Sequence, residues 1–137
     1  MTSIKKYVTG FTAISTMLMF GLSAAITAEA ASAESAEPCI SISRIQDSNI
    51  LDNTHVVFQT GVNKYYLNTL PYACNGLKLH DSFSFSTSIG HLCNVDTISV
   101  LTRYGGAYET GPSCGLGKFE PITKEEIKTL KDELAQK

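Results

Sequence analysis

Apolar and polar side chains alternate along much of the chain beyond residue 39, with the two-residue period of strands that bury one face. The clearest runs are residues 55–60 and 64–70, which are rich in β-branched and aromatic side chains. A Gly-Val-Asn loop at 61–63 separates them, and its Gly and Asn tolerate positive φ angles. The pattern therefore predicts a β-hairpin here.

Shorter alternating runs predict further strands. Residues 82–86 alternate serine with phenylalanine, which sends both rings to one face, and residues 96–103 repeat the alternation. Residues 40–45 begin the pattern, and residues 114–122 form its last strand. Because no crossover helices lie between these strands, they predict a mainly β, disulfide-stapled domain, a small antiparallel barrel or sandwich of five to six strands with one C-terminal helix.

The C-terminal helix is predicted over residues 123–135. Thr123 is a suitable N-cap, and Glu126 three residues later completes a capping box. Ile127, Leu130 and Leu134 fall on one face of this helix. The opposite face mixes acids with lysines and has no basic excess, so we expect the helix to dock on the strands rather than on a membrane.

The first thirty residues have the order of a secretion signal. Two lysines precede an apolar stretch at 7–26, and the small-residue patterns 28–30 and 31–33 follow. We predict a signal peptide at 1–30, cleaved after Ala30 or alternatively after Ala33, then a short flexible leader at 31–38 and a single exported domain at 39–137. About twenty residues could also span a bilayer as a retained anchor. Threonines and serines dilute the stretch, so we expect no stable span after cleavage.

The four cysteines all lie in the predicted exported domain, at Cys39, Cys74, Cys93 and Cys114. None forms the close pair with which a short loop wraps zinc, so two disulfides are favoured over metal or free thiols. Four cysteines allow three pairings. The shortest closure, Cys74 with Cys93, gives a weak preference for that pair and for Cys39 with Cys114.

Charge and histidine placement bear on the possible functions. The chain has a formal net charge of −2, and its basic residues are scattered rather than gathered in a stripe, so we expect no nucleic-acid partner. His55 opens a predicted strand, and His80 and His91 fall in presumed loops far apart in sequence. We therefore expect surface histidines, with no metal site and no cofactor.

Catalytic arrangements have little support. Ser113 precedes a cysteine in a glycine-rich context, without the G-x-S-x-G elbow of a serine hydrolase. Asp52 and Asp96 could form a carboxylate pair for glycoside cleavage, but each stands where an acid caps a turn beside a strand. We interpret both as structural caps and expect no enzymatic activity.

Residues 104–113 contain too much Gly and Pro for a regular element, which predicts a loop carrying Tyr104 and Tyr108. Adaptable glycines beside amphipathic rings are typical of recognition loops, so these tyrosines are the candidate partner contact. The alternative is a flexible connection whose rings cover the end of the strands.

Several short motifs carry a resemblance to a known group of proteins. They are Cys39 with Arg44-Ile45, then Leu51-Asp52, CNGL at 74–77, LCNVDTI at 92–98 and CGLGKFEP at 114–121. This order resembles a family of small exported bacterial proteins of unknown function with four cysteines. Asn53 and Asn75 depart from its pattern, which often has an acid and a proline there. The resemblance implies a periplasmic or secreted location and no particular activity.

Together these features predict an uncharacterised exported bacterial protein, a non-catalytic binding or interaction domain whose partner is a protein or a component of the cell envelope. An inhibitor of an external hydrolase, such as a lysozyme or protease, is the alternative, because small rigid scaffolds lose little entropy on binding. A small hydrolase is the least favoured function.

Overall fold

The computed structural model describes residues 35–87 and 89–137. The chain divides into two units, residues 1–31 and 32–137, and every described residue belongs to the second. The predicted signal peptide and its cleavage after Ala30 lie outside the described residues. Among the described residues, no helix has both the length and the apolar character needed to cross a bilayer.

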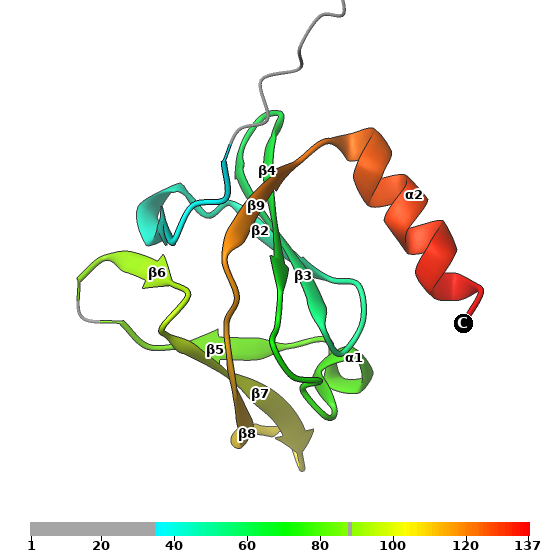
Figure 1. Ribbon diagram of the computed structural model, residues 1–137. Coiled ribbons are helices and arrows are strands. Elements are labelled where there is room, and N and C mark those ends of the chain that lie inside the picture. The colour runs from blue at the N-terminus through cyan, green and yellow to red at the C-terminus, as the bar shows by residue number, and fades with distance from the viewer. Residues whose placement is uncertain (1–34, 88) are drawn as a thin grey trace, which may run out of the picture. The chain divides into compact units, whose positions relative to one another are not determined.

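The described residues form nine strands, two α-helices and one 3-10 helix (Figure 1). The strands are β1 (Cys39–Ser41), β2 (Asp47–Ile50), β3 (His55–Gly61), β4 (Lys64–Thr69), β5 (Phe83–Phe85), β6 (His91–Cys93), β7 (Thr97–Tyr104), β8 (Ala107–Gly115) and β9 (Phe119–Ile122). The helices are η1 (Ile42–Arg44), α1 (Leu77–His80) and α2 (Lys124–Ala135).

The strands pair into three small antiparallel sheets. Their orders are β1-β6, β2-β3-β4-β9 and β5-β7-β8. The predicted mainly β, antiparallel fold with a C-terminal helix is confirmed, but no closed barrel forms among the described residues. The predicted strand over 40–45 is confirmed only at its start, in β1, because residues 42–44 form η1. The additional strands β2 and β6 contain four and three residues, too few to produce a clear alternation in the sequence.

The predicted β3–β4 hairpin is confirmed, with Gln59 opposite Tyr65 and Gly61 opposite Lys64. Its turn differs from the expected one, because neither Gly61 nor Asn63 has a positive φ angle. The predicted strand over 82–86 is also confirmed as β5, whose two phenylalanine rings pack against the core as the alternation indicated.

The predicted last strand, 114–122, is instead divided between β8 and β9. The interruption lies at Gly117, where a Cβ atom would overlap the carbonyl oxygen of Thr69. Asn68, fully buried on β4, donates from Nδ2 to the Gly117 carbonyl (2.7 Å), and its Oδ1 accepts from the Gly117 N–H (2.9 Å). These two hydrogen bonds satisfy the buried N–H and carbonyl groups of Gly117. The same groups are then not available for pairing with a neighbouring strand, so the strand is interrupted here.

One hydrophobic core joins the three sheets. Phe58 on β3 meets Phe83 and Phe119 edge to face, with ring centroids 6.1 Å and 5.7 Å apart. Further fully buried apolar side chains come from β3, β6, β7, α1 and the loop before α1: Val56, Leu92, Ile98, Val100, Leu77 and Cys74. Because each sheet is small, its stability depends on packing against the other two.

Two disulfides are present, as predicted, but the preferred pairing is wrong. The bonds join Cys39 to Cys93 and Cys74 to Cys114. Cys39 and Cys93 are direct cross-strand partners of the β1–β6 pair, with Cα atoms 4.0 Å apart. The preference for the shortest closure failed because β1 pairs with β6 across 54 residues, and sequence distance carries no information about such a pairing.

Helix α2 begins as the sequence predicted. The Thr123 N–H donates to Glu126 Oε2 (2.8 Å), and the Thr123 hydroxyl oxygen accepts from the Glu126 N–H (3.2 Å), which forms the capping box. The apolar stripe Ile127, Leu130 and Leu134 is half-buried. Ile127 lines an open groove together with Val57 and Tyr65 of the four-stranded sheet, so this face of the helix is turned toward that sheet.

Candidate functional site

Residues 104–113, predicted as an irregular loop, form the end of a regular hairpin made by β7 and β8. Gly105 and Gly106 both have positive φ angles, 58° and 92°, as a tight hairpin turn requires. Pro112 is tolerated because β8 is the edge strand of its sheet. Gly111 stands where the register shifts, and a Cβ there would lie 3.1 Å from the Val100 carbonyl oxygen. The glycines and proline therefore shape the hairpin rather than interrupt it.

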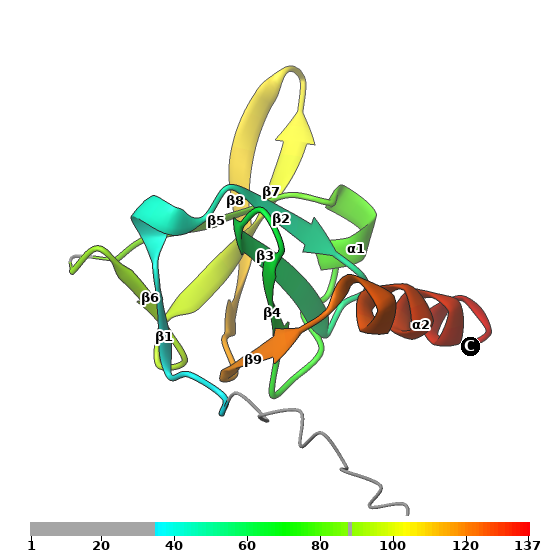
Figure 2. The same ribbon diagram turned by 90° about the horizontal axis from the view of Figure 1, so that it is seen from above.

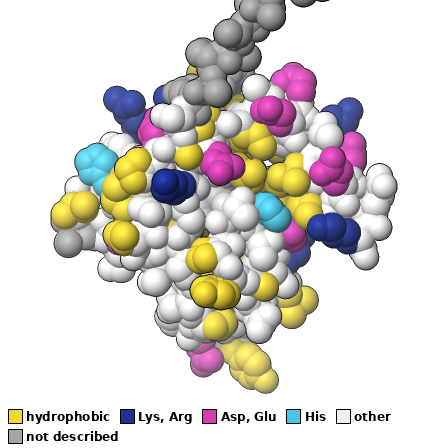
Figure 3. Space-filling model, in the orientation of Figure 1, with side chains coloured by type: hydrophobic (Ala, Val, Ile, Leu, Met, Phe, Trp, Pro, Cys, Tyr) yellow, Lys and Arg dark blue, Asp and Glu magenta, His cyan; other side chains and the backbone are white. Residues whose placement is uncertain are grey.

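The free end of this hairpin carries the two tyrosines predicted as a partner contact. Tyr104 is 78% exposed and Tyr108 is 64% exposed. The Arg103 guanidinium carbon lies 5.8 Å from the centre of the Tyr108 ring, its cross-strand partner. Figure 2 shows the hairpin extending away from the other strands of the domain, and Figure 3 shows hydrophobic side chains at this end.

The opposite end of the hairpin is anchored in the core. Ile98 and Val100 on β7 are fully buried, and Cys114 on β8 is bonded to Cys74. Ser113, which the sequence did not support as a nucleophile, lies opposite Ser99 and shares a hydroxyl–hydroxyl hydrogen bond with it at 2.7 Å. The hairpin thus has a fixed base and an exposed tip.

The three histidines lie on different elements. His55 begins β3, as predicted, whereas His80 ends α1 and His91 begins β6, so the prediction that these two lie in loops is wrong. A single helical turn and a three-residue strand are too short to be recognised from periodicity. Residues 35–87 and 89–137 contain no group of three His, Cys, Asp or Glu side chains placed to hold a metal ion.

Asp52 and Asp96 both cap turns, as interpreted from the sequence. Asp96 Oδ2 accepts from the Cys93 N–H at 2.7 Å. Asp52 Oδ1 accepts from the N–H groups of Thr54 and His55, both at 2.7 Å, and lies 2.9 Å from His55 Nδ1. Partial burial raises the pKa of Asp52, but these hydrogen bonds and the nearby imidazole outweigh it, so the pKa is lowered overall.

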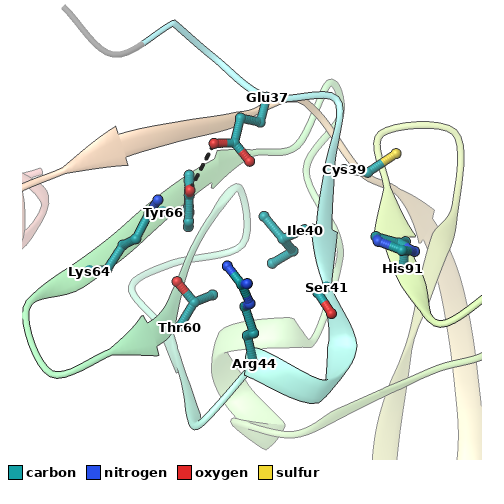
Figure 4. Close-up of a pocket in the computed structure, with 9 residues that line it drawn as sticks. All are labelled: Glu37, Cys39, Ile40, Ser41, Arg44, Thr60, Lys64, Tyr66 and His91. Carbon is teal, nitrogen blue, oxygen red and sulfur yellow. Dashed lines mark hydrogen bonds between the residues drawn. The ribbon is translucent and has the colours of Figure 1, made fainter. Parts of the chain in front are cut away.

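A polar pocket of about 390 Å³ lies between β1, η1 and the β3–β4 hairpin (Figure 4). Its lining residues are Glu37, Cys39, Ile40, Ser41, Arg44, Thr60, Lys64, Tyr66 and His91. No motif in the sequence indicated this site, because its residues come from three separate segments. Arg44 stood within one of the motifs, but nothing there gave it a role.

Glu37 belongs to the folded domain, although the sequence placed it in a flexible leader. Its N–H and carbonyl group pair with Phe119 on β9, at 2.8 Å and 2.9 Å. Its carboxylate accepts a hydrogen bond from the Tyr66 hydroxyl at 2.9 Å. Burial and the neighbouring Glu37 charge raise the pKa of Tyr66, against a lowering contribution from Lys64, so the phenol remains a donor.

Two cations line this pocket. Figure 4 shows the Arg44 guanidinium extending from η1 into the space between Thr60 and Ile40. The Lys64 ammonium nitrogen lies 5.3 Å from the centre of the Tyr66 ring. His91 stands on the other side of β1 from Arg44 (Figure 4). The pocket therefore combines a guanidinium, an ammonium group and several hydroxyls with one carboxylate.

These features define a small, mainly β protein held by two disulfides, which indicate an oxidising compartment outside the cytoplasm. The chain belongs to the family of unknown function DUF6491, whose model matches residues 5–137. The resemblance noted from the cysteine-containing motifs is thereby confirmed. Neither a curated protein nor a solved structure matches the chain.

Proposed function

We propose that this protein is a non-catalytic binding domain, exported to the bacterial periplasm or secreted, which contacts a protein or an envelope component through the tip of the β7–β8 hairpin. The observation that carries the proposal is the exposure of Tyr104 and Tyr108 at the end of a regular hairpin. Large aromatic side chains that are exposed and do not pack into the core are characteristic of contact surfaces.

The physical basis is the low entropy lost on binding. Each tyrosine offers a large amphipathic ring with only two side-chain torsions, and the Arg103 contact restricts Tyr108 further. The Cys74–Cys114 bond and the buried side chains of β7 hold the base of the hairpin in one arrangement. Little further ordering is then required when a partner binds the tip.

The test is the double variant Tyr104→Ser/Tyr108→Ser, with Tyr72→Ser as a matched control. Tyr72 is 83% exposed but lies outside the hairpin. The partner is first identified by crosslinking in intact cells, and the affinity of each purified variant for it is then measured. We expect the double variant to lose about a hundredfold or more in affinity, as central aromatic contacts do, and Tyr72→Ser to bind as wild type. Unchanged affinity of the double variant would show that the contact lies elsewhere.

A second candidate function is inhibition of an external hydrolase, such as a lysozyme or protease. The observation that favours it is the same projecting hairpin, since a pre-organised projection suits insertion into a cleft. Titration of the protein against a panel of such enzymes decides between the two functions. Inhibition that Tyr104→Ser/Tyr108→Ser abolishes would identify an inhibitor, and no inhibition at micromolar protein removes this candidate.

A further inference from the structure

One residue that lines the pocket between β1, η1 and the β3–β4 hairpin has a polar atom without a hydrogen-bond partner in the described part of the chain. The Thr60 hydroxyl oxygen is buried and has no hydrogen-bond partner among the described residues. An orphaned buried hydroxyl of this kind is unfavourable, because it has lost its water partners without gaining a protein partner, and it calls for an explanation such as an absent partner. Thr60 lines the pocket, so a rotation of its side chain would turn this hydroxyl toward a ligand bound there.

The Arg44 guanidinium gives the pocket its chemical preference. No carboxylate within residues 35–87 or 89–137 lies at ion-pair distance from it, and Glu37 is already engaged by the Tyr66 hydroxyl. Arginine presents a planar fork of N–H donors that matches the two oxygens of a carboxylate or phosphate. Lys64 adds a second positive charge to the same lining, in a chain whose net charge is negative.

We propose that this pocket binds a small molecule bearing an oxyanion, a carboxylate or a phosphate, which the Arg44 guanidinium engages through paired hydrogen bonds. The volume of about 390 Å³ falls in the range of small-ligand sites. Ser41 and Tyr66 also line the pocket, where the Ser41 hydroxyl bonds to that of Ser43 and the Tyr66 hydroxyl donates to Glu37. The site is separate from the hairpin tip, so it adds a second binding activity to the one proposed above.

The test is an NMR titration of the isotope-labelled protein with both disulfides formed, using inorganic phosphate in one arm and acetate in the other. Sodium chloride at matched ionic strength is the control. We expect saturable shifts of the Arg44 Nε–H and the Thr60 amide, in about the millimolar range for such small probes. Saturation by phosphate alone assigns a phosphate ligand, by acetate alone a carboxylate, and by both a general oxyanion site.

Two variants make the assignment specific. Arg44→Gln should weaken binding about tenfold or more, because it removes charged hydrogen bonds, while its melting temperature stays that of wild type since Arg44 is exposed. Arg103→Gln removes an arginine on the hairpin instead and should bind as wild type. Shifts no larger than those in chloride, or equal affinities of Arg44→Gln and wild type, would overturn the proposal.

Discussion

The two ends of the β7–β8 hairpin differ in the burial of their side chains and in their covalent attachment to the rest of the domain. At its base, Ile98 and Val100 are fully buried and Cys114 is bonded to Cys74, whereas the tip exposes Tyr104 and Tyr108 to solvent. The same two strands continue from one environment into the other without interruption of their pairing except at the bulge near Val100. One element therefore separates the residues that stabilise the fold from those available for contact, so each group can be changed without the other.

The largest expected effect is at the base. Replacing both cysteines of the Cys74–Cys114 bond with alanine should lower the free energy of unfolding by about 4 kcal/mol, the loop-closure entropy for 40 residues. Urea unfolding measures this change. Removing Cys39 and Cys93 instead should cost a similar amount, but the first variant should accelerate hydrogen exchange at the β7–β8 amides more than the second, because it also frees the base of the hairpin. Equal exchange in the two variants would mean that the bond does not anchor the hairpin.

Truncation of a buried side chain at the base should have the next largest effect. Ile98→Ala leaves a cavity in the core and is expected to destabilise the protein by about 3 kcal/mol. Thr102 lies on the same face of β7, beyond the core, and Thr102→Ala should cost about 0.5 kcal/mol or less. Thermal unfolding of both variants checks this gradient along one strand, and a similar loss at the two positions would contradict it.

The comparison extends to a polar residue, Asp52, whose contribution to the stability of the fold depends on pH. The pKa of Asp52 is lowered in the folded state, so its contribution to stability is present above the unfolded value of about 3.9 and is lost as the pH falls through the folded pKa. Asp52→Asn should therefore be less stable by about 1 kcal/mol at pH 7 and should lose less stability on acidification. Urea unfolding between pH 7 and pH 2 measures both effects. An exposed acid on α2 provides the control, and Asp132→Asn should be as stable as wild type at pH 7.

The smallest effect on stability is expected at the tip. Tyr104→Ser/Tyr108→Ser removes two exposed rings and should change the free energy of unfolding by about 0.5 kcal/mol or less, although it is the variant expected to lose binding. Chemical unfolding alongside the affinity measurement makes this comparison. A loss of several kcal/mol would instead give the rings a structural role, as a cover for the end of the strands.

The sequence patterns correctly predicted those elements whose structure is determined by residues close together in the chain. The β3–β4 hairpin, the two inward rings of β5 and the capping box of α2 each depend on residues close together in sequence, so the sequence was sufficient for them. The same holds for Asp52 and Asp96, whose oxygens reach N–H groups within three residues. Four cysteines in a small chain also sufficed to predict two disulfides.

Features set by tertiary contacts could not be predicted in this way. The disulfide pairing depends on β1 meeting β6, and the break at Gly117 depends on Asn68, 49 residues away. The glycines of the β7–β8 turn indicated irregular structure because the same residues serve loops and tight hairpins. The pocket around Arg44 combines segments that no pattern links, so only the folded chain reveals it.

The most direct test of the hairpin's role is site-specific photocrosslinking in intact cells that produce the protein. A photoreactive phenylalanine analogue is placed at position 108, at the tip, or at position 72, which is even more exposed but lies outside the hairpin. The proposed function predicts one discrete adduct from position 108 and none from position 72. The absence of an adduct from position 108, or the same adduct from both positions, would contradict it.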